Sequence, residues 1–358
     1  MIDLDDPTAL RRGDPSGMLA LVEALGPMVL EGWEAGAAAA PPLRTPRVVV
    51  AAGLGGSGIG GDLLEALVAP TSPVPVVVVK AAALPACVDR DALVVACSYS
   101  GNTEETLAVF DEAARRGAAV MAITSGGALA ARARAAGAPL IAVRPGLPPR
   151  AALPLLLVPM LRLAHRLGLA PADDADVQEA AGLLRRLAAE WGPAAPAAAN
   201  RAKQLAIRLS RALPVVYAAT PGLAPVAYRW KTQLNENAKR FAVWNQFPEA
   251  SHNEVEGWQA PPADAAVVVL RDAEDGARAA REMDAVRALL ARQAGQVDDV
   301  WTQGEGRLAR LLSLILLGDF VSVYAALLRG VDPTPVAAIA AVKRQVQEAL
   351  PPQGTSAP

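Results

Sequence analysis

The chain has 358 residues, of which 53% are hydrophobic and 4% aromatic, and its formal net charge is −2. This length suits two domains of ordinary size, and the hydrophobic content excludes a disordered chain. The near-neutral charge, without a run of Lys or Arg, argues against a nucleic-acid partner. Cys87 and Cys97 cannot build a disulfide framework and indicate a reducing compartment. Because the acidic N-terminus also lacks an apolar signal core, we expect a cytoplasmic protein.

Two apolar segments, 151–169 and 308–328, are long enough to test as membrane spans. The first contains two prolines and three basic residues, and the second contains Arg310 and Asp319. Neither offers a clean run of about 20 apolar residues. We therefore expect two buried helices and no membrane partner.

In the first half of the chain, short β-branched runs alternate with longer helical runs, which is typical of a parallel α/β sheet. The continuous apolar character of these strands indicates that both faces of the sheet are covered. A longer helix from about 150 to 167 closes this half. The expected strands are 47–52, 74–79, 92–96, 118–123 and 139–143, and the helices between them are 58–68, 103–116 and 128–136.

A second series of the same kind follows a charged and then Pro/Ala-rich connection, so we expect two doubly wound parallel-sheet domains. The expected strands of this series are 215–219, 265–270 and 297–302, and its helices are 223–239, 273–292, 305–329 and 335–350. The resulting division is a helical lead-in (1–45), a first domain (46–169), a connecting helix and linker (170–200), and a second domain with a C-terminal helix (201–358).

The segment VVVAAGLGGSGIGGDLLEAL, residues 48–67, carries the pattern G-x-G-x-x-G between an expected strand and an expected helix. Glycines let the backbone approach an anion, and N–H groups at a helix N-terminus point at it. A dinucleotide fold also needs an acidic residue at the end of the second strand, where this chain has Lys80. Three interpretations stay open: a phosphate loop, an NADP loop that uses Lys80, or a tight turn of small residues.

A second loop, CSYSGNTEETL at 97–107, follows the third expected strand. The hydroxyl groups of Ser98, Ser100 and Thr103 gather around Gly101 just before a helix. Hydroxyls and helix N-terminal N–H groups form a pocket for a phosphate monoester without a lysine. Helix capping would account for one of the three hydroxyls. Because the two loops follow neighbouring strands, we expect one crevice, which suits a sugar phosphate better than a dinucleotide.

The second half of the chain supplies groups that can transfer protons. Glu236 lies in the polar run RWKTQLNENAKR, and His252 lies in the loop FPEASHNEVEGW. A histidine in a polar loop favours proton transfer over packing, with a solvated loop histidine as the alternative. His165 lies in an apolar helix and is expected to be structural. Two histidines and two scattered cysteines cannot build a His-rich zinc site, so we expect metal-free acid–base chemistry, unless carboxylates alone hold a hard cation.

Four motifs, GLGGSGIGGD, SYSGNTEET, RWKTQLNENAK and SHNEVEGW, occur here in the order found in the bifunctional phosphoglucose/phosphomannose isomerases. The chain resembles that family, a branch of the sugar isomerase (SIS) domain superfamily, from about residue 48 to the C-terminal DPTPVAAIAAVK. The resemblance implies two flavodoxin-like αβα SIS domains. It also implies interconversion of glucose 6-phosphate, mannose 6-phosphate or both with fructose 6-phosphate, without a metal or other cofactor.

The resemblance implies roles for individual residues. Arg150 is similar to an arginine that stabilises the developing enediolate charge, and Glu236 to the base that moves a proton between C1 and C2. His252 resembles a ring-opening group that the neighbouring subunit of a homodimer contributes, and Lys343 resembles a lysine that assists ring opening. Surface charges are the alternative for Glu236 and Lys343. The residues that resemble the phosphate-binding set are Gly56, Ser57, Ser98, Ser100 and Thr103.

The sequence departs from the family at one place, and two alternative functions stay open. The chain reads KAAALP at 80–85, where the family tends to have an arginine–aromatic stretch, so the pocket wall and the sugar preference could differ. A non-catalytic sugar-phosphate-binding regulatory protein is the first alternative function, although it would not need Glu236 and His252. An NADP-dependent oxidoreductase that uses the glycine loop and Lys80 is the second.

Overall fold

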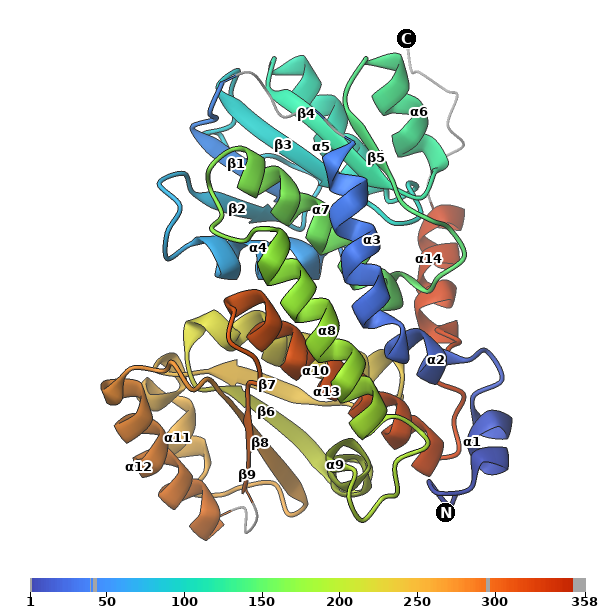
Figure 1. The fold of residues 1–358 in the computed structure, drawn as a ribbon, viewed down its shortest axis with the longest axis vertical. Coiled ribbons are helices and arrows are strands. Elements are labelled where there is room, and N and C mark those ends of the chain that lie inside the picture. Colours follow the sequence, from blue (N-terminus) through green and yellow to red (C-terminus); the bar gives the residue numbers. More distant parts are fainter. Residues whose placement is uncertain (1, 39, 41–43, 294–296, 350–358) are drawn as a thin grey trace.

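The computed structural model describes residues 2–38, 40, 44–293 and 297–349. Figure 1 shows two sheets, one from each half of the chain, with helices packed around and between them. Both sheets are entirely parallel, with the strand orders β2-β1-β3-β4-β5 and β7-β6-β8-β9. These orders reverse direction beside β1 and beside β6, which confirms the expected doubly wound α/β architecture.

The first sheet contains the five strands expected from the sequence. Every residue of β1 and β3 is buried, because helices cover both faces of the sheet. Pro75 has no N–H group to donate, so β2 begins at Val76 and not at Val74 as expected. The strands are β1 (Val48–Ala52), β2 (Val76–Val79), β3 (Ala92–Cys97), β4 (Ala119–Thr124) and β5 (Leu140–Ala142).

The second sheet contains a strand that the sequence analysis missed. β7 (Val243–Gln246) pairs in parallel with β6 at the edge of the sheet. Its four residues are exposed or half-buried, so it lacks the continuous apolar run that marks the other strands. The remaining strands are β6 (Leu213–Ala218), β8 (Ala265–Arg271) and β9 (Val297–Trp301).

The helices of the first domain follow the expected order. The helix expected from about residue 150 begins as a 3₁₀ turn that contains Arg150 and continues as α7. The helix expected from Thr103 begins one residue later, because Thr103 has extended backbone angles and is the N-cap. The elements are α4 (Gly58–Val68), α5 (Glu104–Arg115), α6 (Gly127–Ala135), η1 (Pro149–Ala152) and α7 (Leu153–Arg166).

The helices of the second domain differ from expectation at their ends. The helix expected over 223–239 ends at Glu236, since Asn237 is its C-cap and Lys239 has a φ of 51° in the left-handed region. The expected helix end at 350 lies outside the described residues. The elements are α9 (Arg201–Leu209), which was not expected, η2 (Pro221–Leu223), α10 (Ala224–Glu236), η3 (Glu249–His252), α11 (Glu254–Gly257), α12 (Ala277–Gln293), α13 (Arg307–Leu328) and α14 (Ala337–Ala349).

A layer of helices from distant parts of the sequence joins the two sheets (Figure 1). α3 packs against α7 and α8, and α8 packs in turn against α13. A Cβ at Gly32 would lie 2.6 Å from the carbonyl oxygen of Pro154, so glycine permits the close approach of α3 to α7. The lead-in and the connection therefore contribute to the core. Their helices are α1 (Pro7–Gly13), α2 (Met18–Glu23), α3 (Leu25–Ala37) and α8 (Asp174–Trp191).

α13 is the one described helix whose length and composition would allow it to cross a membrane. In the folded chain, 94% of its apolar window is buried against other elements, including α8, α9 and α10. α13 thus serves as the central helix of the core, as the charged residues within its sequence led us to expect.

Close packing of α10 on α13 yields a stability prediction. The Trp230 indole is buried and donates a 2.8 Å hydrogen bond to the carbonyl oxygen of Leu314, and a Cβ at Gly318 would overlap that ring. We expect Gly318→Ala to lower the free energy of unfolding by about 1–3 kcal/mol in urea titrations. The matched control is Gly182→Ala in α8, where open space surrounds the added methyl group. The control should stabilise the helix by up to about 1 kcal/mol; equal stability of the two variants would contradict the packing.

Candidate active site

The glycine loop between β1 and α4 brings three backbone segments together. A Cβ at Gly53 would lie 2.6 Å from the carbonyl oxygen of Cys97, at the end of β3. A Cβ at Gly56 would lie 2.9 Å from the backbone nitrogen of Arg150, in η1. Glycine is therefore needed where this loop touches the ends of its neighbours. The loop holds Ser57, Cys97 and Arg150 at one edge of the sheet.

Three serines of the two predicted phosphate loops share one hydrogen-bond pattern. The Oγ of Ser57 accepts from the N–H of Tyr99 at 3.1 Å. The Oγ of Ser98 accepts from the N–H of Gly101 at 3.2 Å, and that of Ser100 from the N–H of Asn102 at 3.3 Å. Backbone donors thus occupy acceptor sites of these oxygens. Since a hydroxyl group carries one donor besides its acceptor sites, the O–H groups of Ser57 and Ser100 are left to donate to an anion.

Thr103 and Ser98 lie together at the N-terminus of α5. Thr103 is the N-cap residue of this helix, yet its side chain makes no capping hydrogen bond. Its Oγ1 instead lies 2.9 Å from the Oγ of Ser98. The capping interpretation therefore does not account for this hydroxyl. The cluster of hydroxyls and helix N–H groups has the chemistry of a phosphate-binding pocket.

Lys80, at the end of β2, is engaged by neighbouring helices. Its ammonium group forms an ion pair with Asp62 of α4 and lies 4.9 Å from the centre of the Tyr228 ring of α10. These three residues, with Trp244, line a separate cavity between the two sheets. The charge that an NADP loop would require is therefore paired with a carboxylate of its own domain.

Arg150 is buried at the junction of the two domains. Its Nε donates to Oδ1 of Asn237 at 2.6 Å, and its Nη2 donates to the carbonyl oxygens of Pro333 and Thr334 at 2.8 and 2.9 Å. Its Nη1 lies 3.4 Å from a carboxylate oxygen of Glu236. Burial lowers the pKa of the guanidinium, and the Glu236 charge opposes that shift. The predicted catalytic arginine and the predicted base are thus direct neighbours.

Glu236 is the last residue of α10, and its side chain retains 26% of its surface for contact with solvent or a ligand. Lys239 follows in the chain, and its Nζ donates to the carbonyl oxygens of Glu236 and Pro333 at 2.6 and 3.1 Å. Burial and the nearby Arg150 lower the pKa of this lysine. The site therefore combines one carboxylate with two cations.

The structure does not bring His252 and Lys343 into this cluster. His252 is an exposed residue of η3, and Lys343 is an exposed residue of α14. Neither side chain has a hydrogen bond or an ion pair with another residue in the part of the chain that the structure describes. Nearby, Glu254 accepts hydrogen bonds from Tyr217 and Asn245, so the segment after His252 is fixed to β6 and β7.

Sequence reasoning missed several residues that build the cluster, namely Asn237, Lys239, Pro333 and Thr334. Asn237 and Lys239 belong to the NENAK motif, and Pro333 and Thr334 belong to DPTPV. The presence of these residues in the two motifs was therefore the sequence signal that could have identified them. The sequence could not assign contacts to Pro333 and Thr334, because backbone carbonyl acceptors carry no side-chain signature.

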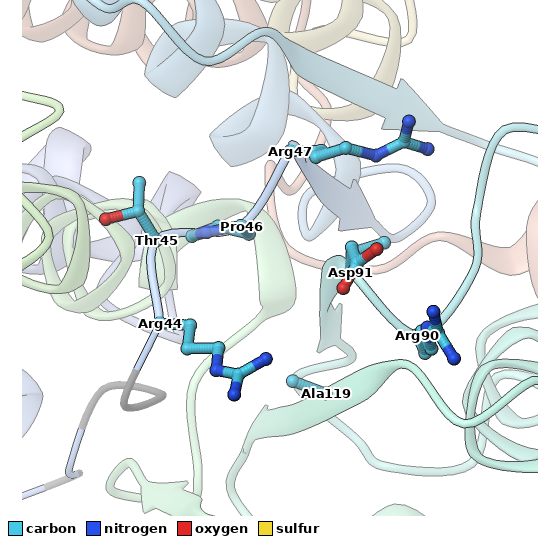
Figure 2. Close-up of a pocket in the computed structure, with 8 residues that line it drawn as sticks. Arg44, Thr45, Pro46, Arg47, Arg90, Asp91 and Ala119 are labelled. Carbon is cyan, nitrogen blue, oxygen red and sulfur yellow. The ribbon is translucent and has the colours of Figure 1, made fainter.

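A cavity of about 620 Å³ lies at the opposite edge of the first sheet (Figure 2). Arg44, Arg47, Arg90 and Asp91 line it, where β1, β3 and β4 begin. The two predicted phosphate loops follow the carboxyl ends of β1 and β3, where ligands bind in open α/β sheets. None of the predicted site residues lines this cavity.

Two family models match the chain and define its class. Residues 43–140 match the SIS domain, and residues 198–346 match the bacterial phospho-glucose isomerase C-terminal SIS domain. The protein is therefore built from two sugar isomerase domains, as the motifs led us to expect.

Individual relatives define the family more narrowly. A bifunctional phosphoglucose/phosphomannose isomerase from Caldicellulosiruptor bescii is 42% identical over 303 residues, which cover 84% of this chain and 89% of that protein. A protein of the same name from Aquifex aeolicus is 38% identical over 305 residues, covering 84% and 90%. The chain belongs to the bifunctional phosphoglucose/phosphomannose isomerase family. It is therefore an enzyme, and the non-catalytic alternative receives no support from these relatives.

Solved structures agree with the fold. A hypothetical protein from Thermus thermophilus is similar with a TM-score of 0.74 and 20% identity, over 96% of this chain and 94% of that chain. A glucose-6-phosphate isomerase like protein from the same organism has a TM-score of 0.63 and 20% identity, over 96% and 99%. At this identity the likeness concerns the fold alone.

Proposed function

We propose that this enzyme interconverts glucose 6-phosphate, mannose 6-phosphate or both with fructose 6-phosphate. The observation that carries the proposal is the pair formed by Arg150 and Glu236, in which one domain contributes a buried cation and the other a partly exposed carboxylate, 3.4 Å away. Aldose–ketose isomerisation needs a base beside C1 and C2 and a cation beside the oxygen that becomes negative. Membership of the family supports sugar phosphates as substrates.

In this proposal the two domains have different roles in the reaction. Residues 46–169 bind the phosphate, residues 201–358 supply acid–base groups, and the lead-in (1–45) and connection (170–200) join them. The phosphate oxygens accept hydrogen bonds from the hydroxyl groups and N-terminal N–H groups of the two loops. The residues proposed to hold the phosphate are Gly56, Ser57, Ser98, Ser100 and Thr103.

The proton transfer follows from the Arg150–Glu236 pair. Glu236 removes the proton from C2 of the open-chain aldose, and the electrons of that C–H bond form the C1=C2 double bond of a cis-enediolate. The carbonyl oxygen O1 becomes negative beside Nη1 of Arg150. The hydroxyl proton of O2 moves to O1, and Glu236 returns its proton to C1 as C2 becomes the carbonyl of the ketose. A carboxylate on one side of the enediolate protonates one face of C2, so formation of both C2 epimers requires the enediolate to present either face of C2 to Glu236.

Ring opening precedes this step and needs an acid. We propose that His252 protonates the ring oxygen while the bond from that oxygen to the anomeric carbon breaks and the anomeric hydroxyl loses its proton to water. Lys343 assists this step. Since neither side chain belongs to the Arg150–Glu236 cluster, we propose that His252 reaches the site from a second subunit of a homodimer.

The exposed face of α14 supports a dimer. Ile339, Val342 and Val346 are 44%, 60% and 53% exposed, and they recur at helical spacing beside Lys343. An apolar helix face of this kind favours coverage by another protein surface. A second copy of the chain is the occupant that would also bring His252 to the neighbouring site.

We propose a cytoplasmic location. Both cysteines are free, with Cys87 exposed and Cys97 buried. An unpaired, exposed thiol is typical of proteins that work in a reducing compartment.

The first test is product analysis with fructose 6-phosphate in the presence of EDTA, with glucose and mannose 6-phosphates quantified separately. We expect the wild type to form at least one of them, and Glu236→Gln to be slower by roughly 10²–10⁴-fold, because it loses the base and keeps the shape of the side chain. The control Glu34→Gln changes an exposed carboxylate of α3 and should match the wild type. Binding of the sugar phosphate by a folded wild type without turnover would instead indicate a regulatory protein.

A second test addresses the origin of His252. We expect dimers of Glu236→Gln alone or of His252→Ala alone to have little activity. In a mixed dimer, one site receives Glu236 from one chain and His252 from the other. After subunit exchange we expect about a quarter of wild-type activity, since half of the dimers are mixed and each has one intact site of two. Exchange verified by mass spectrometry without recovered activity would place both groups in the same subunit.

A further inference from the structure

The Arg150 guanidinium is held by neutral acceptors. A guanidinium has five N–H donors. Three of them point at an amide oxygen and two carbonyl oxygens, those of Asn237, Pro333 and Thr334. The Nη1 group faces Glu236, and its second N–H has no partner among the described residues. Neutral acceptors therefore fix the side chain on two edges, and the Nη1 edge, which it shares with Glu236, keeps one N–H for a ligand.

Asn237 is itself fixed in orientation. Since Arg150 offers only donors, the amide must present Oδ1 to it, which turns Nδ2 the other way. Nδ2 donates to the Oγ of Ser322 at 2.9 Å, and the Ser322 hydroxyl donates to the carbonyl oxygen of Asp319 at 2.7 Å. Asn237 and Ser322 are fully buried. This chain of hydrogen bonds ties the Arg150 side chain to one turn of α13.

The same turn of α13 also fixes the backbone of Arg150. Arg229 donates from Nη2 to the Arg150 carbonyl oxygen at 2.9 Å. Its guanidinium binds Asp319 through both Nε and Nη2, and Gln233 donates to the same carboxylate at 2.8 Å. Residues 319–322 of α13 therefore help to hold both the backbone and the side chain of Arg150, although α13 and Arg150 belong to different domains.

We propose that Asn237 and Ser322 are positioning residues of the isomerase, which orient the Arg150 guanidinium toward the enediolate oxygen without neutralising it. This inference rests on the role of Arg150 in the proposed function. A carboxylate at position 237 would still accept a hydrogen bond from Nε of Arg150, although it could no longer donate one to Ser322. It would, however, compete with the developing oxyanion for the positive charge, and that competition weakens stabilisation of the transition state.

The NEN sequence supplies a matched pair of substitutions. Asn237→Asp places a carboxylate on Nε of Arg150 with no change of shape, whereas Asn235→Asp places the same charge on the other side of Glu236. Asn235 donates from Nδ2 to the carbonyl oxygen of Arg240, as Asn237 does to Ser322, so each substitution also removes one donated hydrogen bond. Among the described residues, no hydrogen bond joins Asn235 to Arg150. We expect Asn237→Asp to lower kcat roughly 10²-fold with KM for fructose 6-phosphate changed by less than about threefold. Asn235→Asp should keep both constants within about threefold of the wild type.

A second readout does not depend on activity. In protein labelled with ¹⁵N-arginine, the Nε–H signal of Arg150, assigned by its loss in Arg150→Lys, should be protected from exchange with solvent. Ser322→Ala removes the acceptor of the Asn237 amide, so we expect exchange at that signal to become at least about tenfold faster. The exchange of the Arg229 Nε–H, bound to Asp319, should be unchanged in this variant and serves as the internal control.

The outcomes separate the positioning role from the proposed function. Equal kcat in Asn237→Asp and Asn235→Asp, or unchanged Nε–H exchange in Ser322→Ala, would overturn the positioning role. A wild type without isomerase activity would overturn the proposed function, while the exchange measurement would still decide whether Asn237 and Ser322 hold Arg150. If Asn237→Asp fails to fold, as thermal unfolding would reveal, Ser322→Ala supplies both the kcat–KM comparison and the exchange rate.

Discussion

The buried ion pair between Arg229 and Asp319 is the interaction on which the site depends. It joins α10 to α13, and Arg229 also donates to the backbone of Arg150 in the other domain. Burial raises the pKa of Asp319, and the Arg229 charge opposes that shift. Removing one partner of such a pair leaves a buried charge without compensation and costs about 3–5 kcal/mol. The enzyme therefore carries a costly polar element in its apolar core, at the place where its two domains must align.

The helical layer provides the apolar surroundings that this alignment needs. α3 and α8 come from segments outside the two sheets, yet they pack against α7 and α13, one helix from each domain. α13 supplies the central turn that holds Arg150, and its burial keeps that turn away from water. Because water would otherwise compete for the hydrogen bonds of Arg229 and Asn237, the apolar layer strengthens the polar network it encloses.

The sequence predicted the sheets better than it predicted the site. Strands β1 and β3 carry continuous apolar runs, so their existence followed from the sequence, whereas the short and half-exposed β7 gave no such signal. Motifs indicated Arg150 and Glu236 as separate candidates, 86 residues apart, but not their contact. That contact depends on packing between domains, which local patterns do not encode. The carbonyl acceptors of Pro333 and Thr334 were beyond sequence reasoning for the same reason.

The central claim is that Glu236 moves one proton between C1 and C2 of a sugar phosphate, and solvent labelling tests it most directly. Fructose 6-phosphate is incubated with the enzyme in D₂O, and the aldose phosphates formed are analysed by NMR and mass spectrometry. The account predicts solvent deuterium at C2 of each aldose phosphate that forms, because the protonated carboxylate exchanges with solvent, and no comparable labelling with Glu236→Gln. Products formed by Glu236→Gln at the wild-type rate and with the same deuterium content at C2 would assign the proton transfer to another group and would contradict the account.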